Sequence, residues 1–360
     1  MDKLIKAREI ISEVDKEIAV LFEKRMEAVR LVAEYKKERG LPVFDSSRED
    51  QVVRNNLENV QDEEIKEFYV PFIKNTMEIS KRLQHRILEG ANIAYSGVEG
   101  AFAHIAAGRI FPDGNRISYP DFKSAYEAVE KGECDCAVIP IENSRAGEVG
   151  QVIDLLFSGS LYVNGVYSLD VRHNLIGLDG VSEKEITKVV SHQQALDQCA
   201  HYIRNQGYKT ESYENTAMAA KYVADLGDPS VAAIASRETA ELYGLNIVRE
   251  NINEASNNTT RFVVLSRTLC KEKRDHSIIV FTVPDKPGAL AHAINVIGHH
   301  GYSMRSIKSR AMKDLIWTYY FYVELTGDLQ SRRGKYMLDE LSDCCDRLKM
   351  IGTFKDNCKI

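Results

Sequence analysis

The sequence predicts three domains: an all-helical domain over residues 1–90, a two-lobed α/β domain over 91–270 and a small α+β domain over 276–360. Three observations predict this organisation. Helical periodicity fills the first domain, short β-like runs alternate with helical stretches after Ala91, and a βαββαβ order follows a charged linker over 271–275. A length of 360 residues is enough for two or three domains.

The helical domain begins with one long helix. No Pro or Gly interrupts the chain between Asp2 and Arg39, and Gly40 and Pro42 then end the helix. A second, short helix opens over 45–49, with Asp45 or Ser46 as its cap and a Ser46–Glu49 capping box. A third runs over 62–88 and contains Pro71. Helices of such unequal length cannot bury the long one within a single chain, so we expect a homodimer or a higher homo-oligomer.

Three cations lie on the long helix. Arg25 and Lys36 are eleven residues apart, which leaves them about 20° from eclipsed and roughly 16 Å apart along the axis. Two such side chains are able to clasp a small dianion. Arg8 lies about 42 Å from Lys36, so a second copy of the chain must deliver it if it serves the same site. The alternative is that all three are solvated charges on an amphipathic helix.

The α/β domain is expected to contain a mainly parallel sheet. The expected strands cover 93–96, 137–140, 188–191, 231–235 and 262–266, and the expected helices cover 124–131, 195–205 and 217–226. The α+β domain is expected to order a strand over 277–283, a helix over 288–300, strands over 302–310 and 317–325, a helix over 332–347 and a strand over 350–354. No G-x-G-x-x-G follows a strand, which argues against a dinucleotide site.

The composition excludes several classes of protein. With 44% hydrophobic and 28% charged residues the chain is an ordinary globular sequence, and a net charge of -6 argues against nucleic acid as a partner. No run of eighteen apolar residues predicts a membrane span, and the N-terminal ten residues lack a secretory signal. Seven cysteines without a CxxC pair predict reduced thiols in a cytoplasmic protein and no metal site.

Several short motifs carry a family resemblance. The chain contains Asn258-Thr-Thr-Arg-Phe262, Pro140-Ile-Glu-Asn-Ser144, Ser191-His-Gln-Gln194 and Asp285-Lys-Pro-Gly-Ala-Leu290, besides the cations of the long helix. With these motifs the chain resembles the bifunctional chorismate mutase–prephenate dehydratases of phenylalanine biosynthesis over essentially its whole length. The resemblance implies a helical mutase domain, a dehydratase domain like a periplasmic binding protein and a C-terminal ACT regulatory domain.

For the mutase domain, the resemblance implies that eight side chains bind chorismate: Arg8, Arg25, Lys36, Asp45, Arg48, Glu49, Ser80 and Gln84. Lys36 and Gln84 are expected to donate to the ether oxygen, and Glu49 to meet the ring hydroxyl. The rearrangement to prephenate is pericyclic, so it needs a held conformer and charge stabilisation but no cofactor. The structural alternatives are that Asp45 and Glu49 cap a helix and that Ser80 is a packing residue.

For the dehydratase domain, the resemblance implies that Thr260 assists the departing hydroxyl by a hydrogen bond, since a Thr hydroxyl is a weak acid. The prephenate-binding residues implied are Asn143, Ser144, Gln194, Thr216, Thr260 and Arg261. Some roles stay open. Arg261 binds a carboxylate or organises its loop, Glu142 is a second acid or caps a helix at 147–149, and His192 acts directly or is structural. Gln193 replaces the usual Pro, and Ala101 stands where Ser or Thr is common.

For the ACT domain, the resemblance implies feedback by phenylalanine, with backbone amides at a helix start receiving its carboxylate. The implied effector residues are Gly288, Ala289, Leu290, Ser309 and Arg310, whereas Lys308 and Ala311 depart from the family's Glu and Pro. The alternative is a domain that only dimerises.

Two other functions fit the sequence less well than this one. A chorismate mutase joined to prephenate dehydrogenase needs a nicotinamide-binding glycine loop, which the chain lacks. A non-catalytic amino-acid sensor has no need for Thr260 or for the eight helical residues.

Overall fold

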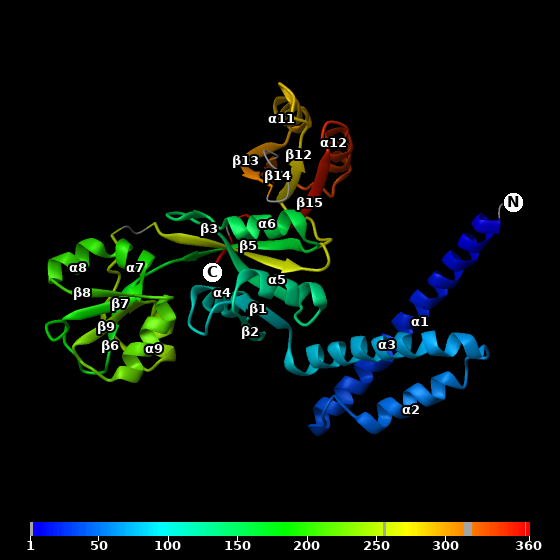
Figure 1. Cartoon of the computed structure of the whole chain (residues 1–360), viewed down its shortest axis with the longest axis horizontal. Coiled ribbons are helices and arrows are strands. Elements are labelled where there is room, and N and C mark those ends of the chain that lie inside the picture. The colour runs from blue at the N-terminus through cyan, green and yellow to red at the C-terminus, as the bar shows by residue number, and fades with distance from the viewer. Residues whose placement is uncertain (1–2, 255–256, 313–318, 357) are drawn as a thin grey trace. The chain divides into compact units, whose positions relative to one another are not determined.

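The computed structural model describes residues 3–254, 257–312, 319–356 and 358–360, with the side chain of Ser46 left out (Figure 1). The chain divides into two compact units. The first contains residues 1–91 and 113–115, and the second contains 92–112 and 116–360. Each unit is described separately.

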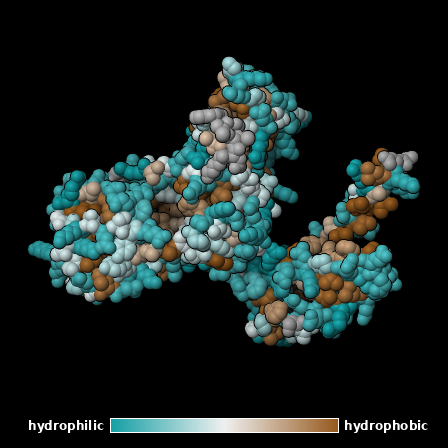
Figure 2. All heavy atoms as spheres, viewed as in Figure 1, coloured by the Kyte–Doolittle hydropathy of each residue, from teal (hydrophilic) through white to brown (hydrophobic). Residues whose placement is uncertain are grey.

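The first unit consists of three helices, as the sequence predicts. They are α1 (Lys3–Arg39), α2 (Ser46–Leu57) and α3 (Glu63–Glu89). The N-terminal half of α1 extends beyond the part that packs on α3 (Figure 1). Large apolar side chains of α1 therefore stay uncovered, with Ile11 58% and Leu21 63% exposed. Phe68 of α3 is likewise 69% exposed. Figure 2 shows this apolar surface along α1. An uncovered apolar face along a helix is typical of an interface with another protein chain.

Aspartates begin the two later helices of this unit. The Asp45 carboxylate accepts a hydrogen bond from the Arg48 N–H at 3.1 Å, and the Asp62 carboxylate accepts one from the Glu64 N–H at 2.9 Å. Because Asp45 is the N-cap and α2 already includes Ser46, the predicted Ser46–Glu49 capping box is wrong. The predicted capping role of Asp45 is confirmed.

The second unit contains two lobes and a C-terminal domain. The first lobe is built from β1 (Asn92–Ser96), α4 (Phe102–Ile110), β2 (Asn115–Tyr119), α5 (Phe122–Lys131), β3 (Cys136–Asn143), β4 (Gly147–Glu148), α6 (Gly150–Ser158), β5 (Tyr162–Asp170) and β11 (Thr259–Ser266). The second lobe is built from β6 (Asn174–Gly177), β7 (Lys188–His192), α7 (Gln193–Gln198), α8 (Ala200–Gln206), β8 (Lys209–Tyr213), α9 (Thr216–Leu226), β9 (Val231–Ala235), α10 (Arg237–Leu242) and β10 (Asn246–Arg249). The predicted two-lobed α/β fold is confirmed.

The direction of the strands differs from the prediction. The pairs β1–β3, β7–β8 and β7–β9 are parallel, but β11 is antiparallel to both β3 and β5, and β6 is antiparallel to β9 and β10. The prediction of a mainly parallel sheet is therefore wrong. The chain leaves the first lobe after β5 and returns through β11, so β11 runs opposite to its neighbours. The helix predicted over 195–205 is also two helices, α7 and α8, which meet at Cys199.

The C-terminal domain has the predicted βαββαβ order. Its elements are β12 (His276–Thr282), α11 (Ala289–His299), β13 (Ser303–Ala311), β14 (Tyr319–Thr326), α12 (Arg332–Asp343) and β15 (Arg347–Phe354), followed by β16 (Cys358–Lys359). The predicted last helix ends four residues early, because β15 already begins at Arg347. Residues 317–318 of the predicted third strand lie outside the described residues.

One continuous sheet joins the C-terminal domain to the first lobe. Its central path runs β13-β14-β12-β15-β5-β11-β3-β1-β2, and β15 pairs in parallel with β5 where Gly352 opposes Val163. A Cβ atom on Gly352 would lie 2.3 Å from the Val163 carbonyl oxygen, so only glycine allows this approach. The lobe that carries β11 is thereby joined to the C-terminal domain through this sheet.

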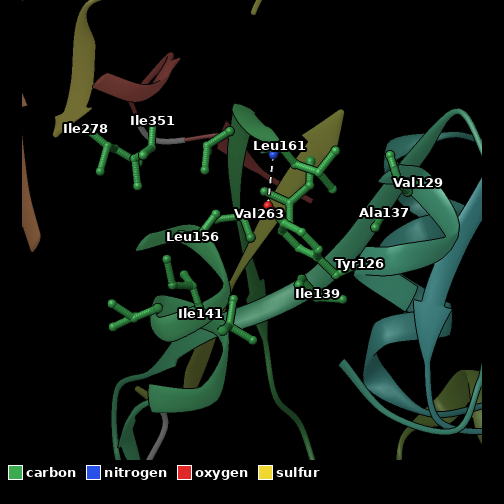
Figure 3. Packing of buried hydrophobic residues seen from close by; sticks show 14 of the residues in the cluster. Tyr126, Val129, Ala137, Ile139, Ile141, Leu156, Leu161, Val263, Ile278 and Ile351 are labelled. Carbon is green, nitrogen blue, oxygen red and sulfur yellow. Dashed lines mark hydrogen bonds between the residues drawn. The ribbon is translucent and has the colours of Figure 1, made fainter. Parts of the chain in front are cut away.

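The core of the first lobe packs α5 and α6 on this sheet. Tyr126 lies among Ile139, Leu156 and Val263, and its hydroxyl accepts a hydrogen bond from the Leu161 N–H at 2.8 Å (Figure 3). Burial raises the pKa of this phenol to about 12, so it stays protonated at all ordinary pH values.

Replacing Tyr126 by Phe leaves the Leu161 N–H buried without its partner. We expect Tyr126→Phe to lower the free energy of unfolding by about 1–3 kcal/mol, measured by urea denaturation. The matched control is Tyr319→Phe at an exposed tyrosine. Equal stability of the two variants would contradict the structural role of this hydrogen bond.

Candidate active sites

A polar site in the first unit lies where α1 faces α3. The Arg25 guanidinium donates to the Ser80 hydroxyl and, at 3.4 Å, to the Thr76 carbonyl oxygen. Burial lowers the pKa of Arg25 from its ordinary value. Gln84, one turn further along α3, is 8% exposed, and its Oε1 has no hydrogen-bond partner among the described residues. A half-buried cation and an unsatisfied amide together are suited to a polar, anionic ligand.

The other residues predicted for this site make separate contacts within the unit. Glu49 forms an ion pair with Lys81 at 2.9 Å, a cation that the sequence analysis did not single out. Lys36 donates to the Val43 carbonyl oxygen at 2.7 Å, and Arg48 donates to the Gln51 amide oxygen at 2.8 Å. Asp45 caps α2, as described above. Arg8 is exposed and lies about 25 Å from Arg25 along α1, so it does not join the others within one chain.

A cleft of about 520 Å³ separates the two lobes of the second unit. Its lining includes Asn143, His192, Gln194, Thr216 and Thr260, all of which were singled out from the sequence. His192 also caps α7, where its Nδ1 accepts a hydrogen bond from the Gln194 N–H at 3.3 Å. Three further residues, Asn258, Gln198 and His173, line the same cleft.

Helix N-termini converge on this cleft. Ala101 is the N-cap residue of α4 and Val149 is that of α6, and neither helix has a side-chain cap. Thr216, the first residue of α9, also lines the cleft. None of the described residues that line it is Lys or Arg. The lining also contains the acids Asp121, Glu148 and Glu214, of which Glu148 is paired with Arg310. Because exposed N–H groups and the helix dipole attract anions, the helix starts are the part of this lining that is able to hold a carboxylate.

The Thr260 hydroxyl lines the cleft and is engaged there as an acceptor. Asn143 Nδ2 donates to Thr260 Oγ1 at 2.8 Å. Since Oγ1 accepts this hydrogen bond, its own hydrogen remains available for a ligand in the cleft.

Three comparisons with known proteins agree with this geometry. Residues 93–269 match the family described as prephenate dehydratase, residues 7–85 match chorismate mutase type II, and residues 276–333 match the ACT domain. The bifunctional chorismate mutase/prephenate dehydratase of Neisseria gonorrhoeae is 30% identical over 98% of this chain and 96% of its own length. The chain belongs to this bifunctional family. It is therefore an enzyme with mutase, dehydratase and ACT domains.

Other relatives cover the second unit. Arogenate dehydratase/prephenate dehydratase 1 of Arabidopsis thaliana is 33% identical over 73% of this chain and 71% of its own length. The structure of prephenate dehydratase from Arthrobacter aurescens in complex with L-Phe has a TM-score of 0.68 at 26% identity, covering 73% of this chain and 89% of that one. A structure described as GqqA, a novel type of quorum quenching acylase, also has a TM-score of 0.68, at 29% identity over 73% of this chain and 97% of that one.

The dehydratase and ACT domains share a charged contact. The Arg261 guanidinium forms ion pairs with Glu142 at 3.0 Å and with Glu324 of β14 at 2.9 Å. Lys308 pairs with Glu142 at 2.9 Å. Burial raises the pKa of the Glu142 carboxyl, but Lys308 and Arg261 outweigh burial, and its pKa lies below the ordinary value.

This contact corrects two expectations. Arg261 and Glu142 are not among the residues that line the cleft. They pair with each other, and Glu324 and Lys308 of the ACT domain pair with Arg261 and Glu142, respectively. Its two cationic partners therefore hold Glu142 as a carboxylate, which argues against the role of a second acid. The helix that it was expected to cap at 147–149 is absent as well, since β4 occupies 147–148 and α6 begins at Gly150.

Two more predicted ligands are engaged elsewhere. The Ser144 hydroxyl donates to the Asn257 carbonyl oxygen at 2.9 Å and accepts from the Thr259 N–H at 3.0 Å, so it ties two loops together outside the cleft. Arg310 pairs with Glu148 at 2.7 Å and with Asp154 at 2.9 Å. Its guanidinium is therefore matched by the dehydratase domain, while its neighbour Ser309 is on the opposite, exposed face of β13.

The effector loop forms as expected at a helix start. Gly288, with φ 83°, is the N-cap of α11, and Ala289 and Leu290 are its first residues. Among the described residues, no group of three or more His, Cys, Asp or Glu side chains is arranged to hold a metal ion. None of the described helices has the length and apolar character needed to cross a bilayer.

The buried His173 makes stability depend on pH. Burial lowers its pKa from 6.5 to about 4, against a smaller opposing effect of the hydrogen bond to Gln198. Between these two pH values the unfolded chain takes up a proton that the folded chain does not. Stability is therefore lost as the pH falls from about 6.5 to 4, by at most roughly 3 kcal/mol.

We expect His173→Gln to reduce this loss, because glutamine does not titrate. Urea unfolding at pH 7 and pH 5 measures the loss for each protein. The control is His201→Gln at an exposed histidine of α8. An equal loss in all three proteins would show that another group is responsible.

Proposed function

We propose that the chain rearranges chorismate to prephenate in the helical domain (1–90) and converts prephenate to phenylpyruvate in the cleft of the dehydratase domain (91–270), under feedback by phenylalanine at the ACT domain (276–360). The observation that carries the proposal is the Thr260 hydroxyl, whose hydrogen is free to donate in a cleft where helix N-termini attract anions. No cofactor takes part in either reaction.

In the mutase site, charge complementarity selects the compact conformer of chorismate. Arg25 exchanges its hydrogen bonds to α3 for a substrate carboxylate, and Arg8 of a second copy binds the other carboxylate. Lys36 and Gln84 donate to the ether oxygen as its bond to carbon breaks. The unsatisfied Gln84 amide and the uncovered apolar face of α1 support this assignment and a homodimer.

In the cleft, decarboxylation and loss of hydroxide occur together. The bond between the ring and its carboxylate breaks, and the electron pair enters the ring as carbon dioxide leaves. The bond between the ring and its hydroxyl breaks, and the departing hydroxide takes a proton from solvent to form water. Thr260 stabilises the departing oxygen by donating a hydrogen bond, while Asn143, Gln194 and Thr216 orient the substrate.

The absence of a cation from the cleft lining suits this reaction. A cation on the ring carboxylate would stabilise the charge that must be lost as carbon dioxide forms. Neutral donors and helix N-termini hold both carboxylates more weakly and leave the ring carboxylate free to react.

Regulation is proposed to pass through the charged contact between domains. Phenylalanine binds beside Gly288, Ala289, Leu290 and Ser309, and a shift of β13 or β14 acts on Arg261 through Lys308, Glu142 and Glu324. Arg261 is adjacent to Thr260, so the effect reaches the cleft within one residue. We also place the enzyme in the cytoplasm, where its thiols stay reduced.

The two activities are assayed separately in the purified chain. Conversion of chorismate to a product that absorbs in alkali as phenylpyruvate supports the proposal, and loss of that conversion on addition of phenylalanine supports the regulation. Absorbance that depends on NAD would support a dehydrogenase, and binding without turnover would support a sensor.

The two sites are expected to fail independently. Arg25→Ala abolishes mutase turnover but leaves dehydration of supplied prephenate within about twofold, and Thr260→Ala does the reverse with a loss of about 100-fold or more. Arg30→Ala on the exposed face of α1 and Thr210→Ala on β8 are the matched controls. Loss of both activities in a folded Arg25 or Thr260 variant would contradict separate sites.

A mixed dimer tests the role of Arg8. Arg8→Ala and Arg25→Ala subunits are each inactive as mutases, but one site of their heterodimer contains both arginines. We expect mutase activity to return to about half of the wild-type value at most. No recovery in verified heterodimers would exclude a cross-chain Arg8.

A further inference from the structure

His173 occupies an unusual position in the cleft. It lies in the short connection between β5 and β6, where the chain passes from the first lobe to the second. Its side chain is only 3% exposed, packs edge-on against Phe102 and lines the cleft. Its backbone N–H donates to the Asn253 side-chain oxygen at 2.6 Å, so the backbone of the residue is held as well.

A chain of hydrogen bonds connects this imidazole to Thr260. His173 Nε2 lies 2.9 Å from Gln198 Oε1, and Asn258 Nδ2 lies 2.8 Å from the same oxygen. Asn143 Nδ2 lies 3.0 Å from Asn258 Oδ1 and 2.8 Å from Thr260 Oγ1. Thus Gln198, Asn258 and Asn143 form an unbroken path between His173 and Thr260.

Two backbone groups set the direction of this path. The N–H groups of Arg145 and Ala146 both donate to Asn143 Oδ1 at 2.9 Å. That amide cannot be turned over without setting its NH₂ group against two donors, so Nδ2 must face Asn258 and Thr260. The Asn258 oxygen then faces Asn143, and the Asn258 NH₂ group must donate to Gln198 Oε1.

The same reasoning assigns the tautomer of His173. Gln198 Oε1 accepts from Asn258, so it is an oxygen, and the imidazole nitrogen beside it must carry a hydrogen. Nε2 is therefore protonated and Nδ1 is not. Nδ1 is buried and has no hydrogen-bond partner among the described residues, which disfavours a second proton there. Burial also keeps the pKa of His173 low, at about 4.

We propose that His173 is a positioning residue of the dehydratase: its Nε2–H anchors the Gln198–Asn258–Asn143 chain, which holds Thr260 with its hydroxyl hydrogen directed at the substrate. This inference rests on the proposed role of Thr260. Backbone donors hold this hydrogen-bond chain only at its Asn143 end. The Gln198 amide at its other end would be free to turn without the imidazole. Without His173, the Gln198 amide loses the donor that fixes its Oε1, and Asn258 loses its fixed acceptor on the side away from Asn143. Asn258 Oδ1 is then held less firmly against Asn143 Nδ2, the group that also donates to Thr260.

Two substitutions separate positioning from packing. His173→Leu fills the space without a donor, whereas His173→Gln places an amide N–H near the former Nε2. We expect His173→Leu to lower kcat for supplied prephenate by about tenfold or more with KM changed less than about threefold, and His173→Gln to recover most of that loss. His201→Leu on the exposed face of α8 is the control, and circular dichroism with urea unfolding reports that the second unit of each variant is folded.

The proposal is overturned if folded His173→Leu keeps kcat within about twofold of the wild type, or if His173→Gln is as slow as His173→Leu. Nitrogen-15 NMR of labelled histidine supplies a test that needs no activity. At pH 7 we expect a protonated Nε2 and a bare Nδ1 for His173, and the opposite tautomer or a charged ring would refute the proposal. If the tautomer is as expected but the wild type does not dehydrate prephenate, the proposed function fails and the hydrogen-bond chain stands.

Discussion

Strand β11 carries the constraint on which the second unit depends. Successive side chains on a strand point to opposite faces, so Thr260 faces the cleft while Arg261 faces the ACT domain. The strand pairs with β3 and β5 along its length, so the backbone positions of these two residues are fixed relative to each other. The Thr260 hydroxyl and the ion pair of Arg261 to Glu324 are therefore carried by one strand.

The two proposed sites differ in how they would bind similar anions. In the helical unit, Arg25 and Lys36 are charged side chains near the expected ligand, and a pericyclic reaction tolerates strong binding of both carboxylates. In the cleft, the described lining contains no Lys or Arg, and helix N-termini take their place. The difference follows from the chemistry, because only the second reaction has to release a carboxylate as carbon dioxide.

The charged residues beside the cleft show why residue type alone misleads. Arg261 and Arg310 are typical carboxylate ligands, yet the structure pairs them with Glu324, Glu148 and Asp154. Their partners come from strands and helices far away in the sequence. Conversely, His173 gives no local signal, because its burial and its hydrogen bond to Gln198 both arise from the meeting of two lobes.

Periodicity and short motifs are local properties of a chain. They are enough to predict the three domains, the long helix α1, the βαββαβ order and the neutral cleft residues Asn143, Gln194, Thr216 and Thr260. Local patterns do not predict the antiparallel course of β11, the partners of Arg261 and Arg310, or the hydrogen-bond chain to His173. Strand direction depends on the route of the whole chain, and the partner of a charge depends on which distant segment folds against it.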